Sequence, residues 1–364
     1  MPKRYFYYLV ILNMIANIML FTPQILYSQR FTGSVQALFW AAPIGTFIIY
    51  LFDRLSKNFR GKSIVDLFKE AFPKWLQKGL LLYFLSLWLT TGLLSISVFT
   101  YIILTFMNPD SNTLVMTILL GGFVCVASMM DTDKILYLLE IVLALSIPFL
   151  AFILYKSLVS PYFSWNSTFE MATYVTHLPS YLAVSTATYA FSGYANMVIF
   201  NKCFQKKQPF KYIWALGLLG FLISIHSFFV PVGFHGTVAV GNYQYPWVDT
   251  ADSIRMNYGI IERLLYPFLL LYTLISLIHA VVHLHISLEF LKGIFPSKKL
   301  TKGKGRFIWP FFFIVSIFLL NVFSTDPIRL AIAKVWLAVR FPSEGILLVI
   351  LYIIKRRIYR GKKA

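Results

Sequence analysis

The sequence predicts an all-α integral membrane protein with about ten transmembrane helices. Of its 364 residues, 58% are hydrophobic and 13% are charged, and the mean hydropathy is +0.71. One globular core cannot bury that much apolar surface. Apolar runs of the roughly 20 residues that a helix needs to cross about 30 Å of hydrocarbon recur along the chain. Lysine and arginine gather in every second connection, as in a multi-pass protein.

Proline, glycine and charged residues mark the ends of the individual spans. The predicted spans cover 5–28, 33–52, 79–106, 112–130, 135–159, 177–201, 211–234, 261–291, 307–325 and 341–355. With ten spans, 26 of the 33 basic residues lie on one side, which the positive-inside rule makes the cytoplasm. Both termini are then cytoplasmic. The net charge of +19 faces the anionic lipid bilayer, so it requires no nucleic acid as a partner.

Two connections show helical patterns of their own. In GKSIVDLFKEAFPKW, Ser63 and Asp66 have the spacing of a capping box, and apolar residues recur on one face. This pattern predicts a short helix on the inner surface, with an ordinary solvated loop as the alternative. On the outer side, YPWVDTADSIRMNYGIIERL predicts a long connection with a helical stretch after Pro246.

Polar side chains inside spans turn toward the bundle or a wet cavity, because lipid offers them no partner. In the first span Asn13 and Asn17 share a face, and Thr22 stands before Pro23, which weakens the helix and predicts a break. The third span carries a stripe of small polar residues that includes Thr90. This stripe either lines a cavity or lets two helices approach closely.

The sixth span is interrupted in a similar way. Thr188, Ser192 and Asn196 share a face of a continuous helix, and Gly193 has no side chain to hold that helix together. One interpretation is close packing of two helices at the glycine. The interpretation that we favour is an unwound segment whose bare amides and carbonyls face a ligand.

The eighth span presents Tyr272, Ser276, His279 and His283 at spacings of four, three and four residues. Two histidines four apart can bind zinc, but no third ligand is evident, so no metal site is predicted. A hydrogen-bonding or proton-sensitive role and polar packing between helices both stay open.

The remaining reactive residues do not form a catalytic arrangement. Glu140 and Glu289 lie near the cytoplasmic boundary and are expected to be interfacial or paired, and Lys156 is expected to reach back to the outer surface. Cys125 and Cys203 form no metal-binding or redox motif. No nucleophile motif, phosphate loop or paired carboxylates occur, so we predict neither an enzyme nor a cofactor.

The interruptions of the first and sixth spans, five spans apart, are typical of an inverted five-plus-five repeat. The segment FSGYAN resembles the FSGxE segment of the amino acid, polyamine and organocation transporter superfamily, with Ala195 where many members have glutamate. The resemblance implies a LeuT-like fold with broken first and sixth helices. We expect one transmembrane domain over 1–364, with repeat one over about 5–159 and repeat two over about 177–355.

A closer resemblance is to the spore germination permease family, the B subunits of nutrient germinant receptors. Tyr245 and Pro246, followed by Glu262, Arg263 and an apolar span, carry this resemblance. It implies a receptor subunit of the spore inner membrane, or of a bacterial cell membrane, that binds a small nutrient, usually an amino acid. It also implies A-type and C-type receptor subunits as partners.

The sequence thus predicts that a nutrient binds between the broken first and sixth helices, with the third and eighth helices completing the pocket. The expected ligand-binding residues are Asn17, Thr22, Thr90, Ser192, Gly193, Asn196 and Tyr272. The alternatives are an ion-coupled amino acid transporter and a structural subunit that binds no small molecule.

Overall fold

A computed structural model describes residues 1–107, 109–205, 209–255, 263–296, 305 and 307–360. Within these ranges the chain is helical, and a helical segment lies at each of the ten predicted span positions. The elements are α1 (Arg4–Ala16), α2 (Phe21–Ser28), α3 (Ser34–Ser56), η1 (Lys57–Phe59), α4 (Ile64–Ala71), α5 (Lys74–Phe106), α6 (Thr113–Ser128), α7 (Thr132–Leu158), α8 (Trp165–Ala172), η2 (Thr173–Thr176), α9 (Tyr181–Thr188), η3 (Tyr189–Asn196), α10 (Met197–Phe200), η4 (Asn201–Cys203), α11 (Ile213–His235), η5 (Ala239–Asn242), α12 (Pro246–Ser253), α13 (Leu265–Ile294), α15 (Ile308–Phe323) and α16 (Asp326–Arg360).

The helices are those of a multi-pass membrane protein. Among the described residues, six helices are long and apolar enough to cross a membrane: α3, α5, α7, α11, α13 and α16. The pair α1 and α2 makes a seventh candidate, bent by 54° at its break. This break lies just ahead of Pro23, which stands in the first turn of α2. N–H groups in the first turn have no partner within the helix, so a proline there costs no hydrogen bond. The full count of ten spans stays a prediction, because α6 and α15 are shorter and the sixth predicted span is divided among α9, η3, α10 and η4.

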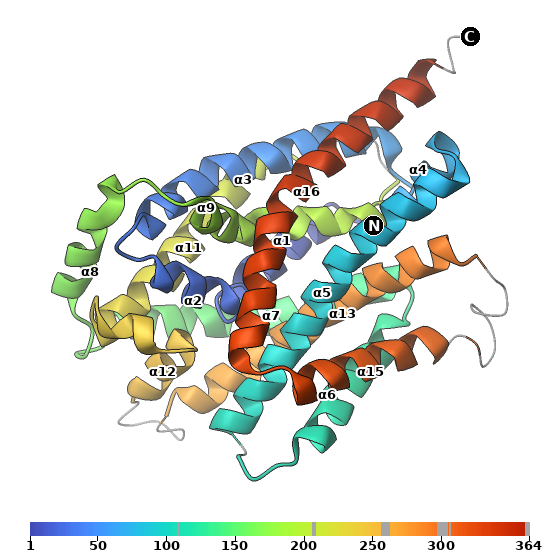
Figure 1. Cartoon of the computed structure of the whole chain (residues 1–364). Coiled ribbons are helices and arrows are strands. Elements are labelled where there is room, and N and C mark those ends of the chain that lie inside the picture. Colours follow the sequence, from blue (N-terminus) through green and yellow to red (C-terminus); the bar gives the residue numbers. More distant parts are fainter. Residues whose placement is uncertain (108, 206–208, 256–262, 297–304, 306, 361–364) are drawn as a thin grey trace.

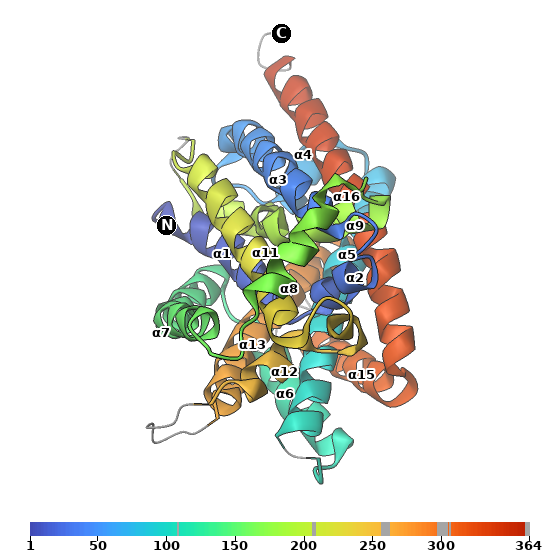
Figure 2. The same ribbon diagram turned by 90° about the vertical axis from the view of Figure 1, so that its left-hand side faces the viewer.

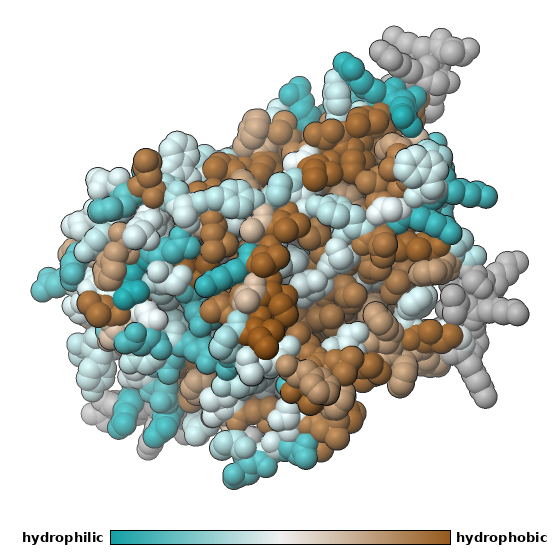
Figure 3. Space-filling model, viewed as in Figure 1, coloured by the Kyte–Doolittle hydropathy of each residue, from teal (hydrophilic) through white to brown (hydrophobic). Residues whose placement is uncertain are grey.

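The two ends of the bundle differ. The N-terminus, α4 and the last turns of α16 lie at one end, and α2, α8 and α12 lie at the other (Figure 1). The same three helices come toward the viewer when the molecule is turned by 90° (Figure 2). Hydrophobic side chains cover the middle of the face seen in Figure 3, and hydrophilic ones gather toward its ends. We call the two ends the α4 end and the α12 end.

The helices α5 and α13 form the centre of the bundle and lie side by side along most of their length. Their contact is close at Gly92, where a Cβ would lie 2.7 Å from a methyl carbon of Leu284. A small residue therefore lets the two helices approach closely. In lipid, helices associate through such close packing because the hydrophobic effect does not drive them together. At Gly92 the third span therefore packs closely against α13, whereas Thr91 beside it lines a pocket.

The last helix begins earlier than the sequence predicts. We expected a span over 341–355, but α16 starts at Asp326, so the expected start was wrong. Arg329 and Arg340 made the segment before 341 look like an aqueous connection. Both arginines are buried instead, and each forms an ion pair with an acid of the same helix, Asp326 or Glu344. An intrahelical partner removes much of the penalty for burying the charge.

Both connections with helical patterns contain the expected helices. Ser63 caps α4, and the reciprocal hydrogen bonds with Asp66 form the predicted capping box. Pro246 begins α12, where its fixed φ suits the first helical position. Glu262 of the resemblance motif lies outside the described residues.

A buried polar cluster closes the α4 end. Arg60 donates to Asp53 at 2.8 Å and to Asn201, and the Phe210 N–H donates to the second carboxylate oxygen of Asp53 at 3.1 Å. The guanidinium of Arg60 also lies 4.4 Å from the centre of the Phe210 ring. These contacts connect the end of α3 with the end of the sixth span.

Polar pairs also join other elements. Glu140 pairs with Arg4 at 2.8 Å and Glu289 with Lys202 at 2.7 Å, which confirms that these acids are paired. Asn321 on α15 joins two helices, because it accepts a hydrogen bond from the Ser97 hydroxyl on α5 and donates one to a hydroxyl on α6 at 2.9 Å. Such bonds between helices help to hold α15 and α6 together in lipid.

Candidate functional site

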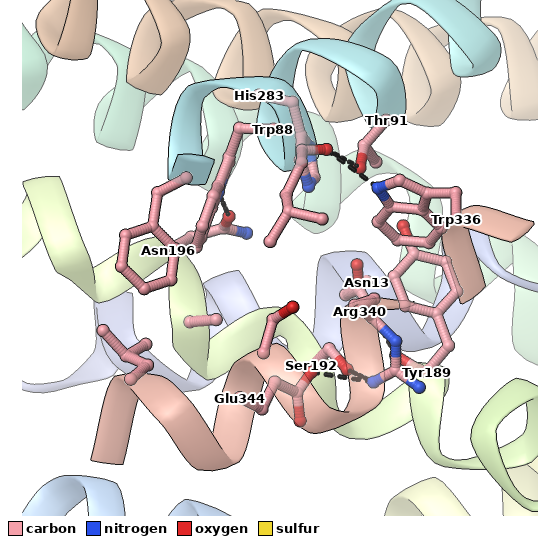
Figure 4. A pocket seen from close by; sticks show the side chains of 15 residues that line it. Asn13, Trp88, Thr91, Tyr189, Ser192, Asn196, His283, Trp336, Arg340 and Glu344 are labelled. Atoms are coloured by element: carbon pink, nitrogen blue, oxygen red, sulfur yellow. Dashed lines mark hydrogen bonds and ion pairs between the residues drawn. The ribbon is translucent and has the colours of Figure 1, made fainter. Parts of the chain in front are cut away.

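A pocket lies where α1, η3, α5, α13 and α16 meet, with a cavity volume of about 40 Å³. We call it the central pocket. It is lined by Asn13, Phe84, Leu87, Trp88, Thr91, Tyr189, Ser192, Ala195, Asn196, His283, Trp336, Arg340, Ser343, Glu344 and Leu347. Arg340, Ser192 and Glu344 lie on one side of it, and Trp88, Asn196 and His283 lie across from them (Figure 4). This mixture of apolar walls and a few converging polar groups is typical of small-molecule sites.

Arg340 is the most highly connected side chain of the pocket. Its Nη1 donates to the Ser192 hydroxyl and to Glu344 Oε1 at 2.7 Å, and its Nη2 donates to the Ser185 carbonyl and to Thr188 Oγ1 at 3.0 Å. Its fifth donor, Nε, is buried and has no hydrogen-bond partner among the described residues. The side chain is only 5% exposed. Arg340 therefore joins α16 to the sixth span through hydrogen bonds. Its Nε–H remains available to donate to a further acceptor.

Glu344 lies one turn beyond Arg340 on the same face of α16 and is 8% exposed. The two charges cancel within the helix. A buried ion pair is weak evidence for stability, because removing both charges from water costs about as much as their attraction returns. Stability alone therefore does not explain this ion pair. Both of its residues line the central pocket.

Across the pocket, Asn196 is held by the indole of Trp88. The Trp88 Nε1–H donates to Asn196 Oδ1 at 2.9 Å. This bond occupies the acceptor end of the amide, so the donor end, Nδ2, points toward the cavity (Figure 4). A ligand in the pocket would meet a fixed N–H donor at this point.

Two histidines of α13 stand behind the pocket. His279 Nε2 lies 3.3 Å from Asn13 Oδ1, and its Nδ1 lies 3.0 Å from the Ser95 hydroxyl. His283 Nδ1 lies 2.8 Å from the His279 carbonyl, so it donates there and leaves Nε2 as an acceptor beside the pocket. Among the described residues, no group of three potential ligands could hold a metal ion.

The sixth span does not unwind. The segment Tyr189–Asn196 is a 3₁₀-helix between two α-helical pieces, so the expectation of an unwound segment was wrong. At Gly193 a Cβ would lie 2.4 Å from the Leu9 carbonyl oxygen and 2.7 Å from Val10 Cα. The glycine therefore serves close contact with α1. A tighter helix keeps the backbone groups bonded to each other, so this segment presents side chains rather than bare backbone groups to the pocket.

The predicted site residues on the broken helices divide between two pockets. Ser192 and Asn196 line the central pocket. Asn17 and Thr22 line a neighbouring one, where the Thr22 hydroxyl donates to Asn17 Oδ1 at 2.5 Å. Gly193 lies in the contact with α1.

The other two predicted residues lie outside the central pocket. Thr90 is half-buried, and its neighbour Thr91 lines the wall in its place. Tyr272 is buried with its ring 4.6 Å from that of Phe268, and its hydroxyl has no hydrogen-bond partner among the described residues.

Sequence reasoning missed the α16 wall, which consists of Trp336, Arg340 and Glu344 among others. The signal was present in the sequence VRFPSE, where an arginine and a glutamate stand four apart, the spacing of an intrahelical ion pair. Arg340 was instead assigned to a connection because charge was used as a boundary.

The chain matches a model of a known protein family. The family model described as spore germination protein matches residues 2–327. No curated protein matches the chain. The matched range ends at the second residue of α16, so the Arg340–Glu344 pair lies beyond it.

Proposed function

Because the chain belongs to the spore germination protein family, we propose that it is the membrane subunit of a spore germinant receptor. In this proposal it binds a small nutrient, with an amino acid as the first candidate, and signals germination to A-type and C-type subunits. Its place is the spore inner membrane, with both termini cytoplasmic.

The central pocket is the observation that carries this proposal. It contains a fixed donor at Asn196, an acceptor at His283 and an ion pair, all surrounded by helices that meet at breaks or changes of helix type. A nutrient signals only if it binds one of two arrangements of these helices more tightly than the other. The 3₁₀-segment and the bend between α1 and α2 are the places where two arrangements would differ.

We propose the five-plus-five inverted repeat as the architecture, with ten spans and with repeats over about 5–159 and 177–355. Support comes from the bend in the first span and the change to a 3₁₀-helix in the sixth, which are five spans apart. The N-terminus lies at the same end of the bundle as α4, which belongs to the most basic connection, and this supports the cytoplasmic assignment (Figure 1).

A pocket-filling variant tests the function. Ala195 is 7% exposed and lines the central pocket, so Ala195→Leu would occupy the space that a nutrient needs. Ala331 lies exposed on α16, and Ala331→Leu is the matched control. Anything that binds only the folded state raises its thermal stability, so the purified wild type should respond to its nutrient.

The expected result is a nutrient-dependent rise in melting temperature for the wild type and Ala331→Leu, and none for Ala195→Leu. Spores that carry Ala195→Leu should then need at least tenfold more nutrient to germinate. A response of Ala195→Leu equal to that of the wild type would place the ligand elsewhere and contradict the proposal.

An ion-coupled amino acid transporter is the second candidate. A further pocket shares Thr91, Tyr189 and Trp336 with the central one and extends to Thr22 on α2, so neighbouring spaces lead toward the α12 end. Accumulation of labelled amino acid in liposomes under a proton or sodium gradient would favour transport. Binding without accumulation would favour the receptor.

A further inference from the structure

We propose that the Arg340–Glu344 pair makes the central pocket selective for a net-neutral ligand that carries one anionic and one cationic group. This inference rests on the proposed function and specifies what its site accepts. It assigns the ligand's charges to α16, the helix that sequence reasoning left out of the site.

The first step is the charge of the pocket. Of its fifteen lining residues, Arg340 and Glu344 are the two that carry a formal charge at neutral pH when the histidine is neutral, and their sum is zero. His283 faces the pocket from α13, and its Nδ1–H donates to the His279 carbonyl. A ligand with a net charge would leave that charge unpaired in a poorly hydrated space, which is strongly unfavourable.

The second step is the unused hydrogen-bonding capacity of the pair. Four of the five guanidinium donors of Arg340 are occupied, and Nε–H is buried without a partner among the described residues. A buried donor without a partner is unfavourable until something accepts from it. A carboxylate is the acceptor that a guanidinium binds best.

Glu344 supplies the complementary half. Its Oε1 accepts from Arg340, and a carboxylate has room for several more hydrogen bonds. An ammonium group that approaches it donates up to three. A zwitterion can therefore insert its two charges beside the pair so that each protein charge meets an opposite ligand charge. The net charge of the pocket stays zero throughout.

The aromatic walls determine what the rest of the ligand should be. The indole of Trp336 is fixed by its Nε1–H bond to the Leu87 carbonyl at 2.9 Å, and its ring packs against Tyr189 with centroids 5.0 Å apart. Together with Trp88 and Leu347, these rings offer apolar surface beside the charged pair, with the Tyr189 ring 5.4 Å from the Arg340 guanidinium. The part of the ligand away from its charges should accordingly be apolar.

Three matched pools of small molecules test the charge rule. The first contains neutral L-amino acids with apolar side chains, the second contains the carboxylic acids that lack their amino group, and the third contains the amines that lack their carboxyl group. The thermal response of the purified full-length protein to each pool is measured over a range of concentrations.

The wild type should respond to the amino acid pool and not to the other two. Glu344→Gln makes the pocket net positive, so it should gain a response to the acids and need at least tenfold more amino acid. Arg340→Gln makes it net negative and should gain a response to the amines. Glu140→Gln removes an equally paired acid outside the pocket, and its preferences should equal those of the wild type.

The double variant Arg340→Gln/Glu344→Gln keeps the test decisive if the single variants do not fold, because it leaves neither charge unpaired. It should lose at least tenfold in its response to the amino acid pool. An unchanged response, or unchanged pool preferences in the folded single variants, would overturn the charge rule. If Ala195→Leu still abolishes binding in that case, the proposed site survives and only the selectivity inference fails.

Discussion

Replacing Gly193 by alanine should separate close helix packing from an open ligand-binding backbone. The Cβ of an alanine at this position would lie 2.4 Å from the Leu9 carbonyl oxygen, where ordinary contacts begin at 3.4 Å. The atoms in the way belong to the backbone of α1 and cannot rotate aside. The 3₁₀-segment and α1 must therefore separate by about 1 Å, the difference between those two distances.

The size of the effect follows from two opposing contributions. Overpacking of a well-packed interior costs about 1–3 kcal/mol, and a clash with backbone belongs at the upper end of that range. Alanine in a helix gains about 1 kcal/mol over glycine. The net loss of unfolding free energy for Gly193→Ala should thus be about 2 kcal/mol.

Gly79→Ala is the matched control. Gly79 lies inside α5, and a Cβ there would meet no atom within 4 Å. This variant keeps the helical gain without the clash, so it should be more stable than the wild type by up to about 1 kcal/mol. Unfolding by a denaturing detergent, from the same mild micelles, would compare the three proteins. Equal stabilities of Gly193→Ala and Gly79→Ala would refute the close contact.

Three further predictions concern other parts of the molecule. Burial raises the pKa of Asp249 to about 6 from a usual 3.8, with nearby Asp252 adding to the shift, so the folded state binds this proton more tightly than the unfolded chain does. The stability of the wild type should accordingly fall as the pH rises from about 4 to about 6. The melting temperature of Asp249→Asn should decrease less than that of the wild type over this pH range. Asn321→Leu removes the bonds from α15 to the hydroxyls of α5 and α6 and should lower the unfolding free energy by about 0.6–1.7 kcal/mol in detergent titration, whereas no change would mean that the bonds do not form. Asp53→Ala leaves the buried charge of Arg60 without its acidic partner and should lower the unfolding free energy by about 3–5 kcal/mol. Asp53→Leu/Arg60→Met removes both charges and should lower it much less in the same assay. A loss for the double variant as large as or larger than that for Asp53→Ala would argue against coupling of the two residues.

Much of the fold could be predicted because lipid imposes simple rules on sequence. A span needs about 20 apolar residues, and the basic connections and the break ahead of Pro23 were visible without coordinates. The capping box of Ser63 and Asp66 was visible for the same reason, since its residues are local in sequence. These features depend on neighbours along the chain rather than on distant partners.

The pocket was harder to predict because its contacts join residues that are distant in sequence. Ser192 and Asn196 could be chosen because polar residues in lipid stand out. The role of Gly193 could not, since a glycine that opens a helix and a glycine that lets another helix approach look alike in sequence. Arg340 was assigned to a connection because of its charge, and its partners at Ser192 and Thr188, about 150 residues away, could not be recognised from the sequence.

The neighbouring helices α6 and α15 have a consequence for the surrounding lipid. Each has 16 residues, which at 1.5 Å per residue gives about 24 Å of helix, against about 30 Å for an average hydrocarbon layer. In the proposed arrangement of ten spans both helices cross the bilayer, and acyl chains beside them would have to compress to avoid exposing their polar ends, whereas the longer helices elsewhere make no such demand. We expect the protein to melt at a higher temperature in short-chain than in long-chain phosphatidylcholine, which would make membrane thickness itself a factor in how easily its helices rearrange.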